Sequence, residues 1–133
     1  MKIQELILET IGPHGRREFE LLLSGEKPLA WFDEEEFAPH RRKIAQLVHE
    51  RDWVIVQHIR DGFMRYIVGQ PGSEQRAQEF LKVVSSPEYN KYRPLDAGWQ
   101  QAHRRAGELL GYSNSDIAEY LELARQRATG LKN

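Results

Sequence analysis

The 133 residues carry 19 basic and 20 acidic side chains, five histidines and no cysteine, and 40% of them are hydrophobic. A chain of this length buries enough surface to fold without disulfides or metals, so we expect one domain over residues 1–133. The lack of cysteine excludes thiol nucleophiles, thiolate-bound zinc and iron–sulfur clusters. The net charge of −1 gives no overall attraction to nucleic acid or to an anionic membrane.

The N-terminal apolar run contains acidic residues, which argues against a secretion signal, and no apolar stretch is long enough to cross a bilayer. We therefore expect a cytoplasmic protein, of bacterial type, with no membrane partner. Apolar residues at helical spacing predict helices over about 3–11 and 16–24. Gly12–Pro13 and Gly25 follow these helices and would end them.

The next segment predicts a strand, a single helical turn and a helix. The short apolar run at 28–32 is typical of a strand. Asp33 and Glu36 have the spacing of a capping box, but Pro39 would interrupt a longer helix. We expect one turn there, followed by a new helix over about 39–51.

Two β-rich runs separated by Asp61–Gly62 predict a hairpin over 53–69 with a type I′ turn. The turn sets the register, in which Arg60 faces Phe63 and His58 faces Arg65 on one side of the ribbon. The other side is the more apolar one, and we assign its residues to the core: Trp53, Ile55, Ile59, Met64, Tyr66 and Val68.

The C-terminal half predicts helices over about 77–84, 99–110 and 114–124, with a loop over 88–96 after the first of them. Helices on both sides of a hairpin indicate an α+β fold: a small antiparallel sheet of about three strands, including the 53–69 hairpin, packed by five to six helices. So small a sheet needs a helix or a partner chain over at least one edge, which leaves a homodimer open.

Motifs of common enzyme classes are absent from the sequence. It contains no phosphate-binding glycine loop, no Gly-x-Ser-x-Gly elbow and no His-Glu-x-x-His pair. The five histidines lie too far apart in the sequence to form a local metal site. We therefore expect no cofactor and no metal, and favour a non-enzymatic role.

Histidine–arginine clusters occur at the starts of two predicted helices, where the helix dipole disfavours cations. A bound phosphate, carboxylate or acidic partner would reverse that penalty. The alternative is that the arginines pair with the protein's own acids, such as those at 33–36. The anion-binding candidates are His14, Arg16, Arg17, His40, Arg41 and Arg42.

A second group of candidates comes from the hairpin and the 88–96 loop, where cations and aromatic residues lie close together. Tyrosine and arginine often anchor protein interfaces. His103 shares a helical face with Trp99 and Leu110, which favours a packed histidine over a catalytic one. The surface-binding candidates are His58, Arg60, Arg65, Tyr89, Tyr92 and Arg93.

Three functional hypotheses follow from these patterns. The leading one is a binding or regulatory module that engages another protein through its surface. The first alternative is an enzyme or sensor that holds an anionic small molecule in the histidine–arginine clusters. The second is nucleic-acid binding through a helix-turn-helix-like pair near Gly111, which is disfavoured because Asp116, Glu119 and Glu122 face outward where cations are needed.

Overall fold

The computed structural model describes residues 17–130, so the helix expected over 3–11 lies outside the described residues. The chain divides into two compact units. One, here called the sheet unit, is Glu18–Leu81; the other, here called the helical unit, contains Arg17 and residues 82–130 of the described chain. Each is considered by itself below, and the expectation of a single domain stays a prediction.

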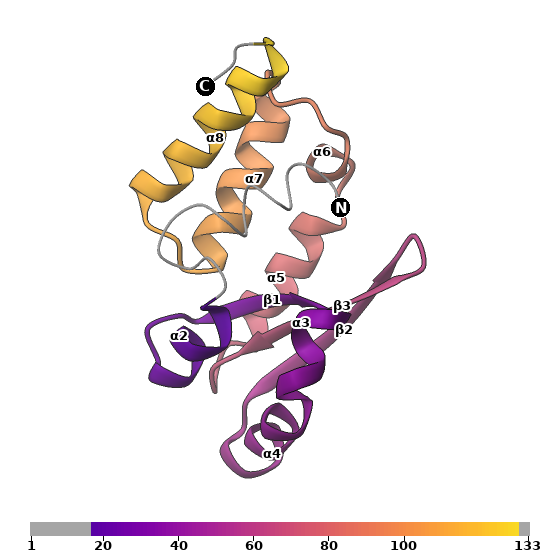
Figure 1. Ribbon diagram of the computed structural model, residues 1–133, viewed down its shortest axis with the longest axis vertical. Coiled ribbons are helices and arrows are strands. Elements are labelled where there is room, and N and C mark those ends of the chain that lie inside the picture. Colours follow the sequence, from indigo (N-terminus) through magenta and orange to yellow (C-terminus); the bar gives the residue numbers. More distant parts are fainter. Residues whose placement is uncertain (1–16, 131–133) are drawn as a thin grey trace. The chain divides into compact units, whose positions relative to one another are not determined.

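The sheet unit contains a three-stranded antiparallel sheet formed by β1 (Leu29–Asp33), β2 (Val54–Arg60) and β3 (Phe63–Gly69) (Figure 1). The strand order is β1-β3-β2, so β1 and β2 lie at the two edges. An α+β fold with a small antiparallel sheet is therefore confirmed.

The β2–β3 hairpin has the predicted register, in which Arg60 pairs with Phe63 and His58 with Arg65. Asp61 and Gly62 both have positive φ angles, 52° and 80°, as a type I′ turn requires. Because this turn matches the right-handed twist of the strands, the two turn residues are enough to fix which side chains share a face.

Helices of the sheet unit surround the strands in the chain order α2, α3, α4 and α5. Asp33 caps α3 as predicted: its carboxylate accepts the Glu36 amide at 2.7 Å, and the Glu36 carboxylate accepts the Asp33 amide at 3.0 Å. Pro39 lies in a short 3-10 turn, so the following α-helix begins at Arg41, two residues later than expected. The bounds are α2 Glu18–Ser24, α3 Glu34–Phe37, the 3-10 turn Ala38–His40, α4 Arg41–Arg51 and α5 Glu74–Val84, of which residues 74–81 belong to the sheet unit.

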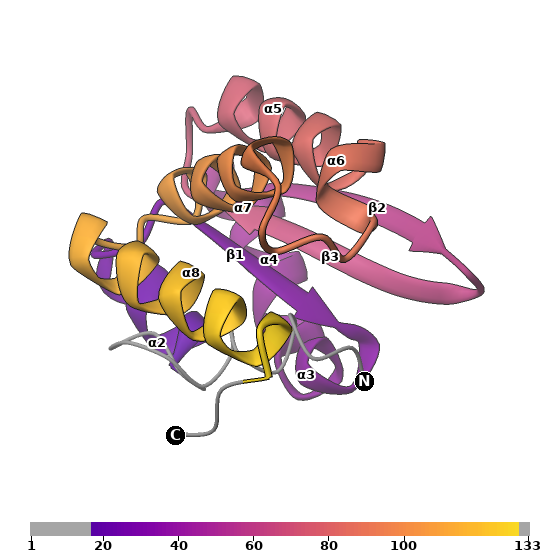
Figure 2. The ribbon, with the colours of Figure 1, turned by 90° about the horizontal axis from the view of Figure 1, so that it is seen from above.

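One face of the sheet packs against α2, α3 and α4 and forms a hydrophobic core. The assignment of Ile59 to this core is wrong, since 65% of Ile59 is exposed. The reason is geometric: β1 pairs with β3 only from Arg65 to Gly69, so the hairpin end projects beyond the third strand (Figures 1 and 2). The buried core residues are Leu22, Ala30, Phe32, Phe37, Ile44, Leu47, Trp53, Tyr66 and Val68.

The helical unit is built around two antiparallel helices, α7 (Ala97–Leu109) and α8 (Asn114–Ala128) (Figure 2). Gly111 (φ 88°) turns the chain between them, and Ser113 caps α8 by accepting the Asp116 amide. A short helix, α6 (Pro87–Asn90), replaces the first part of the expected 88–96 loop. No helix in residues 17–130 has the length and apolarity to cross a membrane.

Candidate binding groove beside strand β2

An open cavity of about 530 Å³ lies in the sheet unit between α4 and the strands β2 and β3. We call it the α4 groove. Its volume falls within the range of small-molecule and side-chain pockets, roughly 300–1,000 Å³. It lies on the face of the sheet that carries the hydrophobic core, and buried Tyr66 belongs both to that core and to the groove lining.

Stacked aromatic rings form one end of the α4 groove. Phe37 and Tyr66 lie 3.8 Å apart between ring centroids and are nearly parallel, at 9°. The Arg41 guanidinium lies 5.0 Å from the centroid of Phe37, within cation–π range. Because α3 supplies Phe37 and β3 supplies Tyr66, this end of the groove exists only in the folded sheet unit.

A three-residue polar network fixes the same end. The Tyr66 hydroxyl donates to Glu34 Oε2 at 2.5 Å, and Arg41 donates to the other oxygen of Glu34. The hydrogen bond to Glu34 raises the pKa of Tyr66, and the hydrogen bond with Tyr66 raises the pKa of Arg41. At neutral pH the phenol therefore stays protonated and the guanidinium stays charged.

One face of α4 forms a wall of the groove. Arg41, Ala45, Val48 and His49 share this face because they are spaced at i, i+4, i+7 and i+8. Ala45 is exposed and has only a methyl side chain, so the wall is open at its centre. The opposite side of α4 is fixed by buried Ile44 and Leu47.

The edge strand β2 forms the facing wall through Ile55 and Gln57. The closing pair of a two-residue hairpin, here Arg60 and Phe63, is a hydrogen-bonded pair, and pairs alternate along an antiparallel ribbon. The backbone N–H and C=O groups of Ile55 and Gln57 therefore point away from β3. No strand of the described chain pairs with that edge.

The anion-binding candidates do not gather at one place in the sheet unit. His40 stacks on Phe19, with centroids 4.1 Å apart, and so serves packing. Arg41 lines the α4 groove, and Arg42 is exposed. His14 and Arg16 lie outside the described residues, and Arg17 belongs to the helical unit.

The hairpin candidates lie on the sheet face opposite the groove. Arg65 lies over the Trp31 ring at 5.5 Å, and the His58 ring lies 6.2 Å from the same ring. Arg60 forms an ion pair with Asp61 at 3.8 Å. Burial, followed by the charges of Arg60 and Arg65, lowers the pKa of His58. This face thus holds a cationic and aromatic cluster, distinct from the groove.

The candidates of the 88–96 segment divide between core and surface. Tyr89 was expected at the surface, but it is buried and stacks on His103 at 4.0 Å. His103 is packed, as predicted: its Nε2 lies 2.9 Å from the Tyr89 carbonyl oxygen and its Nδ1 lies 2.7 Å from the Tyr120 hydroxyl. Tyr92 remains 42% exposed, and Arg93 lines a smaller cavity.

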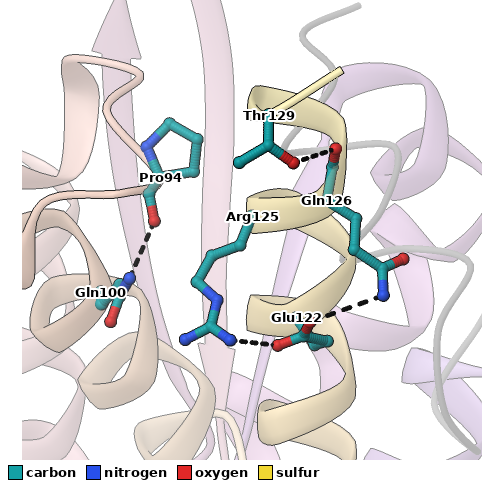
Figure 3. A network of polar contacts seen from close by, with 6 residues as sticks. All are labelled: Pro94, Gln100, Glu122, Arg125, Gln126 and Thr129. Carbon is teal, nitrogen blue, oxygen red and sulfur yellow. Dashed lines mark hydrogen bonds and ion pairs between the residues drawn. The ribbon is translucent and has the colours of Figure 1, made fainter. Parts of the chain in front are cut away.

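Helix α8 exposes the acidic side chains Glu119 and Glu122, whereas a DNA-recognition helix would expose cations. Its first arginine, Arg125, pairs with Glu122, and Gln126 donates to the same carboxylate at 3.5 Å (Figure 3). The outer face of α8 is therefore stabilised within the helix itself, by the i,i+3 contact of Glu122 with Arg125 and the i,i+4 contact of Glu122 with Gln126. Within residues 17–130, no three histidine or acidic side chains gather closely enough to hold a metal.

Sequence reasoning found Arg41 but missed the other groove residues. Phe37 and Tyr66 are brought together only by the packing of α3 on β3, which leaves no local sequence signal. The position of β2 at the sheet edge follows from the β1–β3 pairing. A usable signal was present in α4, where Ala45 is a small exposed residue soon after the basic run at 41–43.

No family model matches the chain, and no curated protein matches it. Among solved structures, the fold is similar to that of the bacterial cysteine methyltransferase effector NleE, with a TM-score of 0.62 and 18% sequence identity. The similarity covers 90% of this chain and 64% of that one, so the chain spans less than two thirds of the structure it matches. At this identity the likeness shows a shared fold.

Proposed function

We propose that this chain is a protein-binding module, and that the sheet unit captures an extended, acidic segment of a partner. The segment adds to the outer edge of β2 and places an apolar side chain in the α4 groove. The observation that carries the proposal is the coincidence of two features at the same residues. Ile55 and Gln57 turn their backbone groups outward, and their side chains line the groove.

Strand addition is a common way for a folded domain to bind a peptide. Main-chain hydrogen bonds to an edge strand supply affinity, and a pocket for alternate side chains supplies specificity. The α4 groove has the form of such a pocket, because its aromatic end and Val48 accept apolar groups. The outer edge of β2 also has unpaired backbone groups, and folded proteins commonly cover or pair such an edge.

The charge of α4 favours an acidic partner. Four of its eleven residues are arginine or lysine, and Glu50 is its one acid. Arg42 is exposed and lies about one turn before Ala45 on the helix. Arg41 in the groove wall, with exposed Arg42 next to it in the sequence, favours a peptide that alternates acidic and apolar residues.

Fluorescence polarisation tests the proposal with two labelled peptides, one alternating valine and glutamate and one alternating valine and lysine. The acidic peptide should bind and the basic peptide should not. Ala45→Arg fills the centre of the groove and should weaken acidic-peptide binding at least about tenfold, or about 1.4 kcal/mol. Added positive charge alone would strengthen that binding, so a loss identifies the groove.

Ala118→Arg is the matched control, because Ala118 is an exposed alanine on α8 in the helical unit. It adds the same side chain and the same charge on a different helix. Equal affinity of both peptides, or equal behaviour of the two arginine variants, would contradict the proposal.

A second candidate, methyl transfer, is favoured by the likeness to the NleE methyltransferase structure. Such an enzyme must hold a methyl donor, and the α4 groove has the volume for S-adenosylmethionine. Calorimetric titration with S-adenosylmethionine tests this candidate: saturable heat that Ala45→Arg abolishes would support it, and no heat would remove it.

A further inference from the structure

The outer row of strand β2 continues beyond the α4 groove and reaches Ile59 near the hairpin turn. We propose that Ile59 and Met64, its neighbour on β3, form a second apolar subsite for the same partner segment. We call these two residues the hairpin subsite. This inference rests on the proposed strand addition, and it adds a requirement on the partner: a second apolar residue on the face of the added strand that enters the groove.

The strand register places Ile59 in line with the groove. Ile55, Gln57 and Ile59 alternate along β2, so their side chains share the face of the sheet on which the groove lies. Hydrogen-bonded pairs also alternate along the hairpin, so the backbone groups of Ile59 point away from β3, as do those of Ile55 and Gln57. A strand that adds to this edge along its length therefore passes both the groove and Ile59.

The exposure of Ile59 is the second observation. Ile59 is 65% exposed, although the other members of its face pack into the core or line the groove. It lies opposite Met64 in a non-hydrogen-bonded pair, the arrangement in which facing side chains lie closest. Met64 is partly buried and packs against the core. The hairpin subsite is thus an apolar surface with one member held by the core and the other open.

The chemistry of the hairpin subsite defines the partner sequence more closely. Side chains on one face of a strand recur about every 6–7 Å, so the partner residue facing Ile59 lies two positions from the one facing Gln57. Methionine is unbranched and adaptable, so the subsite accepts apolar side chains of different shapes. The partner residues in between face the other side of the sheet, where β2 carries Arg60, so acidic residues suit those positions.

Fluorescence polarisation of the full chain tests the hairpin subsite with two labelled peptides that have the same alternating glutamates. The three-valine peptide has valine at three successive alternate positions, and the one-valine peptide keeps the middle valine and has serine at the outer two. Both should bind, and the three-valine peptide should bind about fivefold more tightly, or about 1 kcal/mol. Ile59→Thr should abolish that difference and leave one-valine binding unchanged, because threonine is β-branched like isoleucine but less apolar.

Phe63→Thr is the matched control, since Phe63 is 69% exposed at the same end of the hairpin but shares the opposite face with Arg60. This variant should keep the fivefold difference. Equal binding of the two peptides by the unmodified chain, a difference that survives Ile59→Thr, or one that Phe63→Thr also abolishes overturns the hairpin subsite and leaves the groove proposal standing. If the unmodified chain binds neither peptide, strand addition itself is wrong, and the subsite with it.

Discussion

His103 shows how burial decides the chemistry of a single side chain. It is stacked between Tyr89 and Trp99 and bonded through both ring nitrogens. Burial lowers its pKa from 6.5 to about 4. At neutral pH the ring is uncharged, which suits a core position and excludes a role as a general acid.

The first prediction concerns acid stability. Because unfolded histidine takes up a proton near pH 6.5 and folded His103 only near pH 4, the unfolded state binds more protons in this window. The free energy of unfolding should therefore fall by about 3 kcal/mol as the pH decreases from 6.5 to 4. Urea denaturation at several pH values measures it. His103→Gln should be less stable at pH 7, but its free energy of unfolding should depend much less on pH between 6.5 and 4. An unchanged pH dependence in this variant would contradict its origin in His103.

Lys27 gives a prediction of the same kind at alkaline pH. Its side chain is 1% exposed, and burial lowers its pKa from 10.5 to about 8, against the opposing charge of Glu18. Between pH 8 and 10.5 the unfolded state binds more protons, so stability should rise with pH, by about 3 kcal/mol from this group. In Lys27→Met, the free energy of unfolding should no longer rise with pH in this range. If the rise persists in that variant, groups other than Lys27 cause it.

The β2–β3 hairpin depends on the positive φ angles of its two turn residues, Asp61 and Gly62. Gly62 has a φ of 80° with nothing within 4 Å of an added Cβ, so Gly62→Ala strains the turn without a steric clash. We expect a loss of about 1–2 kcal/mol in unfolding free energy. Gly98→Ala in α7 is the contrasting control, since its Cβ would meet Glu88 at an ordinary 3.7 Å. That variant should be neutral or stabilising, and equal losses in both would contradict the turn assignment.

Helices, strands and turns could be predicted from the sequence where residues only a few positions apart determine them. The Asp61–Gly62 turn gave the hairpin register, and the Asp33–Glu36 spacing gave the capped turn of α3. Ile59 was misplaced because alternation along a strand does not tell how far a neighbouring strand extends.

The groove and Tyr89 were harder to predict for the same physical reason. The groove depends on contacts between residues far apart in the sequence, such as Phe37 with Tyr66. The burial of Tyr89 depends on a helix, α7, that follows it. Local composition carries no information about either contact.

At the scale of the whole chain, the net charge of −1 conceals separate charged surfaces. Helix α4 is basic, whereas the outward side of α8 carries Glu119 and Glu122. A partner is therefore attracted locally, and added salt should weaken that attraction. Raising sodium chloride from about 0.05 to 0.5 M shortens the screening length severalfold, so acidic-peptide affinity measured by fluorescence polarisation should fall by an order of magnitude. Salt-independent binding would contradict the role of α4.

The central claim is that the outer edge of β2 receives a partner strand, and amide hydrogen exchange measures this residue by residue. With the valine–glutamate peptide bound, the amides of Ile55 and Gln57 should exchange markedly more slowly, because they point outward and gain acceptors. The amides of Val56 and His58, already directed at β3, serve as internal references and should change little. Unchanged exchange at Ile55 and Gln57 in a peptide-saturated sample would contradict strand addition.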